Sequence, residues 1–216
     1  MLHRFRFVRP VAPAALLLTL LLGACSSGGG KAAAAHQQPK NAASVTLDGL
    51  KLGVVNVQSA GPPVNIDNAT RSAALAVAQK YVDTAIVAPL RDGSLGAGYA
   101  SLFDTGIAPV ATTTDSPALT DAQVGKLEGY HETTTPVMLS ALADQTGALL
   151  YLATNFTLQV KSTSKTEPLT ISRTVELTLT PNAQRKWVVG AYRVLVARQR
   201  PTGTTTATAQ SGGTKP

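Results

Sequence analysis

The spacing of apolar residues changes once along this chain, from every third or fourth residue to every second. Between Ala74 and Ile86 the three- and four-residue spacing is typical of an amphipathic helix. From Val137 onward apolar and polar residues alternate, as in strands with one buried face. Helices followed by strands predict an α+β fold, with N-terminal helices packed on a curved antiparallel sheet of about four strands. A β-sandwich is the alternative, and the long helix counts against it.

The predicted long helix has recognisable ends. Asn65 or Asp67 can cap its start, and Pro89 followed by the Asp92-Gly93 pair closes it. Two shorter helices are expected after it, near Leu95–Asp104 and over Thr120–Glu128. The second begins with Thr120 and has Gln123 three residues later, the spacing of a capping box.

Four later stretches are expected to be strands, because their apolar residues alternate with polar ones or form a short continuous run. They are Val137–Leu142, Ala148–Val160, Leu169–Thr180 and Trp187–Arg198. An earlier stretch, Val45–Val57, alternates only in part and contains the turn signal Asp48-Gly49. We expect it to form one strand or a small hairpin arm.

The N-terminus has basic residues, then an apolar stretch that ends at the only cysteine of the 216 residues. The run Leu20-Leu21-Leu22-Gly23-Ala24-Cys25 resembles the lipobox of bacterial lipoproteins, whose cysteine takes a diacylglyceryl group after cleavage before it. This resemblance implies lipidation of Cys25 and a location on the outer face of the cell membrane. An ordinary signal-peptide cleavage site is the alternative. The stretch Val11–Ala24 is too short to span a bilayer.

Composition divides the rest of the chain. We expect residues 1–24 to be a signal peptide, 25–44 a flexible tether, 45–64 the strand or hairpin arm, 65–200 the main domain and 201–216 a disordered tail. Residues 145–216 hold nine basic and two acidic residues, a net charge of +7. This basic part of the chain can bind anionic lipids or wall polymers, or its charge can simply aid solubility. Nucleic acid is not expected as a partner, because the N-terminus predicts export and no nucleic-acid recognition motif is present.

The order of these elements resembles the NTF2-like (cystatin-like α+β) superfamily over about residues 65–198. The likeness rests on a long helix ending near Tyr81, a short helix ending in Leu102-Phe103-Asp104, and a strand meander finishing on Lys186-Trp187-Val188-Val189. It is a likeness of pattern, without a shared motif. Small exported domains of this kind are common in actinobacteria, including membrane-tethered proteins associated with lipid-import operons. The resemblance implies a cone-shaped, mainly apolar cavity between helices and sheet.

Some members of this superfamily, such as ketosteroid isomerase and scytalone dehydratase, transfer protons in that cavity. Such chemistry needs an Asp or His base and an acid such as Tyr. Asp104 and His131 are the candidate catalytic residues, and Asp83 is a further carboxylate. The simpler interpretation is that Asp104 ends its helix in a turn and that His131 is an exposed connector residue. No ligand spacing predicts a metal site, and no motif predicts a cofactor.

Candidate ligand-binding residues lie on the predicted strands and helices. Counting by twos places Arg173 with Ile171 and Val175, and Arg193 with Leu195 and Trp187, on apolar faces. Two guanidinium groups there would hold an anionic head group, although side chains reaching out from a sheet edge are the simpler interpretation. Tyr81 and Tyr99 are further candidates, or else core aromatics with paired hydroxyls.

These patterns predict a membrane-anchored extracytoplasmic lipoprotein that binds a ligand or partner at the cell envelope, without enzymatic activity. Its expected partners are the membrane, a hydrophobic or anionic ligand, or an envelope protein. One alternative is an isomerase- or dehydratase-type enzyme that uses Asp104 or His131. The other is a structural envelope protein that forms homodimers through its sheet face.

Overall fold

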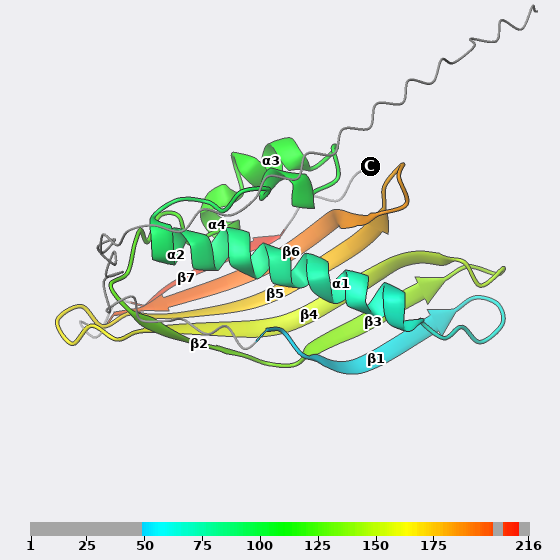
Figure 1. The fold of residues 1–216 in the computed structure, drawn as a ribbon, viewed down its shortest axis with the longest axis horizontal. Coiled ribbons are helices and arrows are strands. Elements are labelled where there is room, and N and C mark those ends of the chain that lie inside the picture. Colours follow the sequence, from blue (N-terminus) through cyan, green and yellow to red (C-terminus); the bar gives the residue numbers. More distant parts are fainter. Residues whose placement is uncertain (1–48, 201–204, 212–216) are drawn as a thin grey trace, which may run out of the picture. The chain divides into compact units, whose positions relative to one another are not determined.

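One mixed β-sheet with helices on one face forms the described part of the computed structural model (Figure 1). That part comprises residues 49–200 and the backbone of residues 205–211. Cys25, the signal peptide at 1–24 and the tether at 25–44 lie outside the described residues. The helices occupy the face on which a second sheet of a β-sandwich would pack, so the sandwich alternative is wrong for this part of the chain.

The sheet follows the order β1-β3-β4-β5-β6-β7, and the short β2 pairs with β4 off this path. β1 runs parallel to β3, and the other strand pairs are antiparallel. The strands are β1 (Leu52–Ser59), β2 (Tyr130–Thr134), β3 (Val137–Ala143), β4 (Leu149–Ser162), β5 (Thr170–Pro181), β6 (Trp187–Gln199) and β7 (Thr205–Ser211).

The four strands predicted after the helices form β3 to β6, but the sheet is wider than predicted and is mixed rather than antiparallel. β1 joins it as a parallel partner of β3, because the intervening helices return the chain to the same end of the sheet. β2 occupies a stretch expected to be a connector. β7 lies in the tail 201–216 for which disorder was expected. Its backbone pairs with β6, and such pairing needs no large apolar side chain.

The long helix begins where the sequence predicts. α1 (Asn68–Tyr81) is capped by Asp67, whose Oδ1 accepts a hydrogen bond of 2.6 Å from the Thr70 N–H. The same hydrogen bond holds the pKa of the Asp67 carboxyl below its usual range. The buried residues of α1 are spaced four and three apart, so one stripe of the helix faces the sheet.

Beyond Tyr81 the helix widens and then tightens again. It passes through a π-helical segment, η1 (Val82–Val87), into α2 (Ala88–Asp92), which ends at Gly93 in the left-handed conformation with φ of 77°. Pro89 was expected to help close the helix, but it lies at the start of α2. Proline lacks an N–H and is tolerated there because the first turn of a helix needs no internal donor.

Two carbonyl groups of η1 have no partner within the helix, because of the π-helical pairing of this segment and because Pro89 has no N–H to donate. Two loops bind these carbonyls instead. The Gly96 N–H donates to the Thr84 carbonyl at 2.8 Å, and the Asp121 N–H donates to the Ala85 carbonyl at 3.0 Å. Gly96 comes so close to the helix that a Cβ there would lie 2.7 Å from the Thr84 Cα. The π-helical segment therefore fixes the position of the loop that carries Asp121.

Three short helices follow: η2 (Ala100–Leu102), α3 (Ala108–Thr112) and α4 (Ser116–Leu119). η2 lies inside the predicted Leu95–Asp104 helix, but the helix predicted over Thr120–Glu128 does not form. The Thr120 carbonyl, which would be the first acceptor of that helix, accepts a bond from Arg173, and the Val124 N–H donates to the Asp121 carbonyl instead. Within the described residues, no helix has the length and apolar character needed to cross a bilayer.

Candidate functional site

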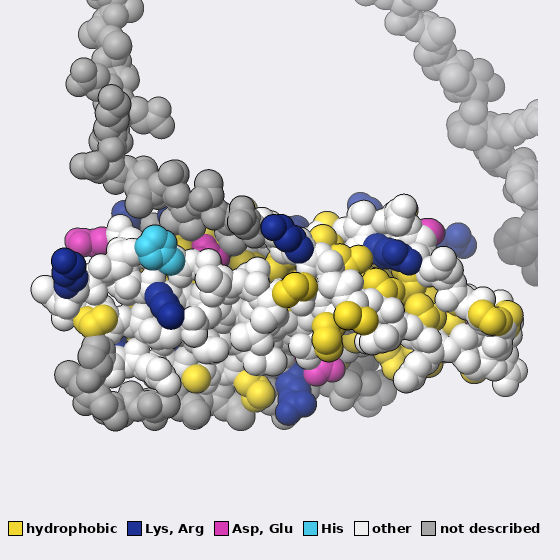
Figure 2. Space-filling model, turned by 90° about the horizontal axis from the view of Figure 1, so that it is seen from below, with side chains coloured by type: hydrophobic (Ala, Val, Ile, Leu, Met, Phe, Trp, Pro, Cys, Tyr) yellow, Lys and Arg dark blue, Asp and Glu magenta, His cyan; other side chains and the backbone are white. Residues whose placement is uncertain are grey.

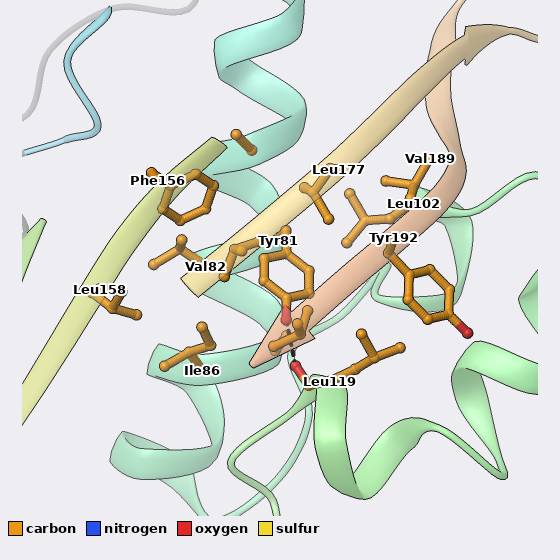
Figure 3. Packing of buried hydrophobic residues seen from close by; sticks show 14 of the residues in the cluster. Tyr81, Val82, Ile86, Leu102, Leu119, Phe156, Leu158, Leu177, Val189 and Tyr192 are labelled. Atoms are coloured by element: carbon orange, nitrogen blue, oxygen red, sulfur yellow. Dashed lines mark hydrogen bonds between the residues drawn. The ribbon is translucent and has the colours of Figure 1, made fainter. Parts of the chain in front are cut away.

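Side chains fill the space between the helices and the sheet (Figure 3). Tyr81 projects from α1 among residues of β4 and β5, including Phe156, Leu158 and Leu177, and all four are buried. The Tyr81 hydroxyl donates to the Leu119 carbonyl at 2.6 Å. This space, where the resemblance to NTF2-like proteins implies a cavity, is therefore occupied by the protein's own core.

Arg173 lies in this core and is wholly buried, so its side chain neither reaches out from a sheet edge nor lines a cavity. Its Nε and Nη2 donate to the two carboxylate oxygens of Asp121 at 3.0 and 2.7 Å. Nη1 donates to the Ala118 carbonyl and Nη2 also donates to the Thr120 carbonyl, both at 2.7 Å. The guanidinium group is thus bound by the protein itself, in the bidentate geometry that makes such pairs strong.

Asp121 is the partner that balances this charge, and its side chain is 0% exposed. A second arginine, Arg198 at the end of β6, reaches the same carboxylate at 3.2 Å with a side chain that is 21% exposed. Burial alone would lower the pKa of Arg173, but the attraction of Asp121 outweighs it, and the pKa lies above its usual value. The cluster therefore brings two guanidinium groups to one carboxylate.

The hydroxyls of Tyr81, Tyr99 and Tyr192 are also bound within the fold. Tyr99 donates to the Ala111 carbonyl at 3.1 Å, and Tyr192 donates to Asp115 at 2.7 Å. Burial raises the pKa of Tyr81 to about 12 and raises that of Tyr99 as well. These tyrosines hold the 111–121 segment against the sheet and are poor acids near neutral pH.

Arg193 lies on the other face of the sheet from the position that counting by twos predicts. Gly190 is an extra residue in β6, since Ala191 pairs with Thr178 and Val189 pairs with Leu179. This β-bulge shifts the alternation, so Val189 is buried while Arg193 is exposed. Arg193 stands directly opposite Glu176 on the helix-free face, beside a shallow hollow of about 100 Å³.

His131 and Asp83 do not form a site together with Asp104. His131 is exposed on β2, opposite Lys161 of β4. Asp83 lies in η1 and accepts a hydrogen bond of 2.8 Å from Gln79. Among residues 49–200 and 205–211 no group of three His, Cys, Asp or Glu side chains is placed to hold a metal ion.

Glu132, next to His131, is a partly buried carboxyl that sequence reasoning missed. It stands opposite Val160, which is buried on the helix-covered face, so Glu132 points inward. Both of its carboxyl oxygens are buried, and neither has a hydrogen-bond partner in the part of the chain that the structure describes. Burial, with a smaller contribution from Asp83, raises the pKa of Glu132 to about 7.

An open cleft of about 600 Å³ lies between the η2–α3 segment and the turn that joins β5 to β6. Phe103, Ala108 and Val188 contribute apolar surface to it, and Ser101, Asp104 and Asn182 contribute polar groups. Asp104 is the sequence-predicted candidate that lines this cleft.

Backbone contacts fix both walls of the cleft. The Asp104 N–H donates to the Val189 carbonyl at 2.8 Å, and the Asp104 Oδ1 accepts from the Gly106 N–H at 2.9 Å. Across the cleft, the Asn182 Oδ1 accepts from the N–H groups of Gln184 and Lys186. The cleft is therefore largely preformed, as small-molecule sites usually are.

The cleft lacks the groups needed for proton transfer between two residues. Among the described residues that line it, Asp104 is the one titratable side chain, without a histidine or tyrosine beside it. Isomerase or dehydratase chemistry would need a histidine or tyrosine within reach of this carboxylate. Comparisons with protein-family models, with curated proteins and with solved structures find no match to this chain.

Proposed function

We propose that this chain is a lipid-anchored extracytoplasmic binding protein with an NTF2-like domain. It is held at the outer face of the cell membrane through Cys25, and it binds its ligand without catalysing a reaction. The observation that carries the proposal is the preformed cleft of about 600 Å³, which offers apolar surface and one carboxylate but no acid–base pair. The lipobox-like run before Cys25 supports the anchor, and the helices on one face of the β3–β6 meander support the domain class.

The cleft indicates the chemistry of the ligand. Asp104 brings a negative charge, and no arginine or lysine is found among the described residues that line the cleft. An anionic head group would be repelled there, and the buried Arg173 is already paired with Asp121. The expected ligand is therefore neutral or cationic, with an apolar part that covers Phe103 and Val188 and with hydrogen-bond donors for Asp104.

The test is to identify small molecules that copurify with the natural lipoprotein from membranes. Ala108→Trp would fill the cleft, and Asp104→Asn would remove its charge; Ala122→Trp, an exposed site outside the lining, is the matched control. We expect mass spectrometry to show a species that is enriched with the natural chain and with the control but lost with Ala108→Trp. A species bound equally by all variants, or no enriched species, would contradict the proposal. The intact mass of the same sample tests the diacylglyceryl group on Cys25 separately.

A further inference from the structure

β1 is the edge strand of the sheet, and within the described residues its outer edge pairs with no other strand. Its eight residues, Leu52–Ser59, include no charged residue and no proline. Natural sheets usually protect an exposed edge with lysine, proline, a bulge or a covering segment. The register of β1 shifts between Leu52 and Val55, so a bulge interrupts the start of the strand, whereas Val55–Ser59 pairs regularly. This regular part has no charged residue and is suited to pairing with another strand.

Exposed apolar side chains gather beside this edge. Four large hydrophobic residues are strongly exposed on β1, β3 and β4: Val54 (57%), Met138 (47%), Leu150 (48%) and Tyr151 (37%). We call these four residues the β1 patch. The register places Val54 next to Met138, because Val55 pairs with Leu139, and it pairs Tyr151 with Leu142. Seen from below, hydrophobic side chains collect toward one end of the molecule (Figure 2).

The β1 patch lies on the helix-free face of the sheet. Along β3, the exposed Met138 and Ser140 alternate with the buried Val137, Leu139 and Ala141. The buried residues belong to the core beneath the helices, so the exposed ones point to the opposite side. Within the described residues, no layer covers the β1 patch or the open edge, and the polar pair Asn56 and Ser140 lies between the two apolar ends of the patch.

We infer that this surface binds a second copy of the same chain, with β1 of one protomer paired antiparallel to β1 of its partner about a two-fold axis. An identical strand in antiparallel orientation supplies matching N–H and C=O groups. The contact is isologous, so it uses the β1 edge of both copies and closes after two.

Charge favours this occupant over a membrane or an anionic polymer. Cleavage before Cys25 removes three arginines and lowers the formal net charge of the chain from +7 to +4, so two copies still repel each other wherever basic residues meet. Neither β1 nor β3 contains a charged residue, and the β1 patch has none. A self-contact here avoids like-charge repulsion, whereas an anionic surface would find no basic group in the patch to attract it.

Cysteine cross-linking in native membranes tests the arrangement. Val54, Asn56 and Gln58 lie on one face of β1, and Thr178 lies in the middle of the sheet as the control position. If Cys25 is lipidated, a cysteine introduced at one of these positions is the only free thiol of the chain. We expect one β1 variant to form a disulfide-linked dimer at least tenfold faster than Thr178→Cys, because cross-strand Cα atoms approach to within disulfide range.

Light scattering of the detergent-solubilised natural chain gives an independent measurement. We expect a dimer, and we expect Val54→Lys with Asn56→Lys to weaken dimerisation at least tenfold without changing the melting temperature. Thr178→Lys on the same sheet face is the control and should remain a dimer. A monomeric natural chain, a dimer insensitive to the β1 lysines, equal cross-linking at Thr178, or open-ended oligomers would each overturn the inference. Dimerisation does not depend on the cleft, so Ala108→Trp should leave it unchanged.

Discussion

Removing the charge of Asp121 should destabilise the fold more than any other change in the arginine cluster. Asp121→Asn keeps the size of the side chain but leaves the guanidinium groups of Arg173 and Arg198 without a counter-charge. Breaking a buried ion pair from one side costs about 3–5 kcal/mol, because a buried charge is left unpaired. Since two cations share this carboxylate, we expect a loss of about 4 kcal/mol in the free energy of unfolding.

The opposite change, Arg173→Met, should cost less. It removes the bonds to the Ala118 and Thr120 carbonyls, but Asp121 keeps Arg198 at 3.2 Å. We expect a loss of about 3 kcal/mol. The double variant removes both charges of the main pair, so its loss should be about 4 kcal/mol rather than the sum of about 7 kcal/mol.

Urea unfolding at pH 7, followed by circular dichroism, measures all three variants. For a domain of this size, about 4 kcal/mol corresponds to a fall of roughly 8–16 °C in melting temperature. If Asp121→Asn fails to fold, a double variant that does fold still shows that Asp121 and Arg173 stabilise the protein as a pair. Losses that add within about 0.5 kcal/mol would refute the reasoning, because additivity means that the two side chains do not act as a pair.

Two further predictions concern Glu132 and Gly96. The pKa of Glu132 is about 7 in the fold against a usual 4.5, so its protonated form is favoured; its contribution to stability is complete below pH 4.5 and is lost as the pH rises through 7. After allowance for solvent screening, Glu132→Gln should raise the free energy of unfolding by roughly 1–2 kcal/mol at pH 8 and leave it unchanged at pH 4. Equal urea midpoints for the variant and the natural chain at pH 8 would disprove this. Gly96→Ala places a Cβ 2.7 Å from the Thr84 Cα and should cost about 2 kcal/mol or more, whereas Ala97→Ser, at an exposed neighbour, should be neutral. An unchanged melting temperature for Gly96→Ala would show that the loop is not in close contact with η1.

The parts of the fold that sequence predicted well are those with a long local pattern. α1 has its cap at Asp67, and β3 to β6 follow from alternation over many residues. β2 and β7 were missed because a short polar strand is stabilised by its neighbour's backbone and not by its own apolar residues. The helix predicted over Thr120–Glu128 shows the reverse case, in which a local capping signal is overridden by a distant arginine.

The site was predictable only in part, for the same reason. Alternation correctly placed Arg173 on the inward face of its strand, and a buried arginine requires a buried acid. Which acid it meets depends on a contact across 52 residues of chain, which no local pattern reveals. Arg193 was placed on the wrong face because the extra residue at Gly190 reverses the count. The cleft is lined by the loop at Asp104 and by the turn at Asn182, which is far away in the sequence. Of these two residues, only Asp104 was predicted as a site residue from the sequence.

Because of the π-helical turn, the number of residues between Tyr81 and Pro89 cannot change without moving the residues that follow. Deleting one residue from η1 would let an ordinary α-helix form, and each later residue would then rotate by about 100° around the helix axis. The Ala85 carbonyl would turn away from the Asp121 amide, and the carboxylate of Asp121 would lose the backbone bond that helps to place it beneath both arginines. A one-residue deletion in this buried turn would therefore also dismantle the ionic cluster around Asp121.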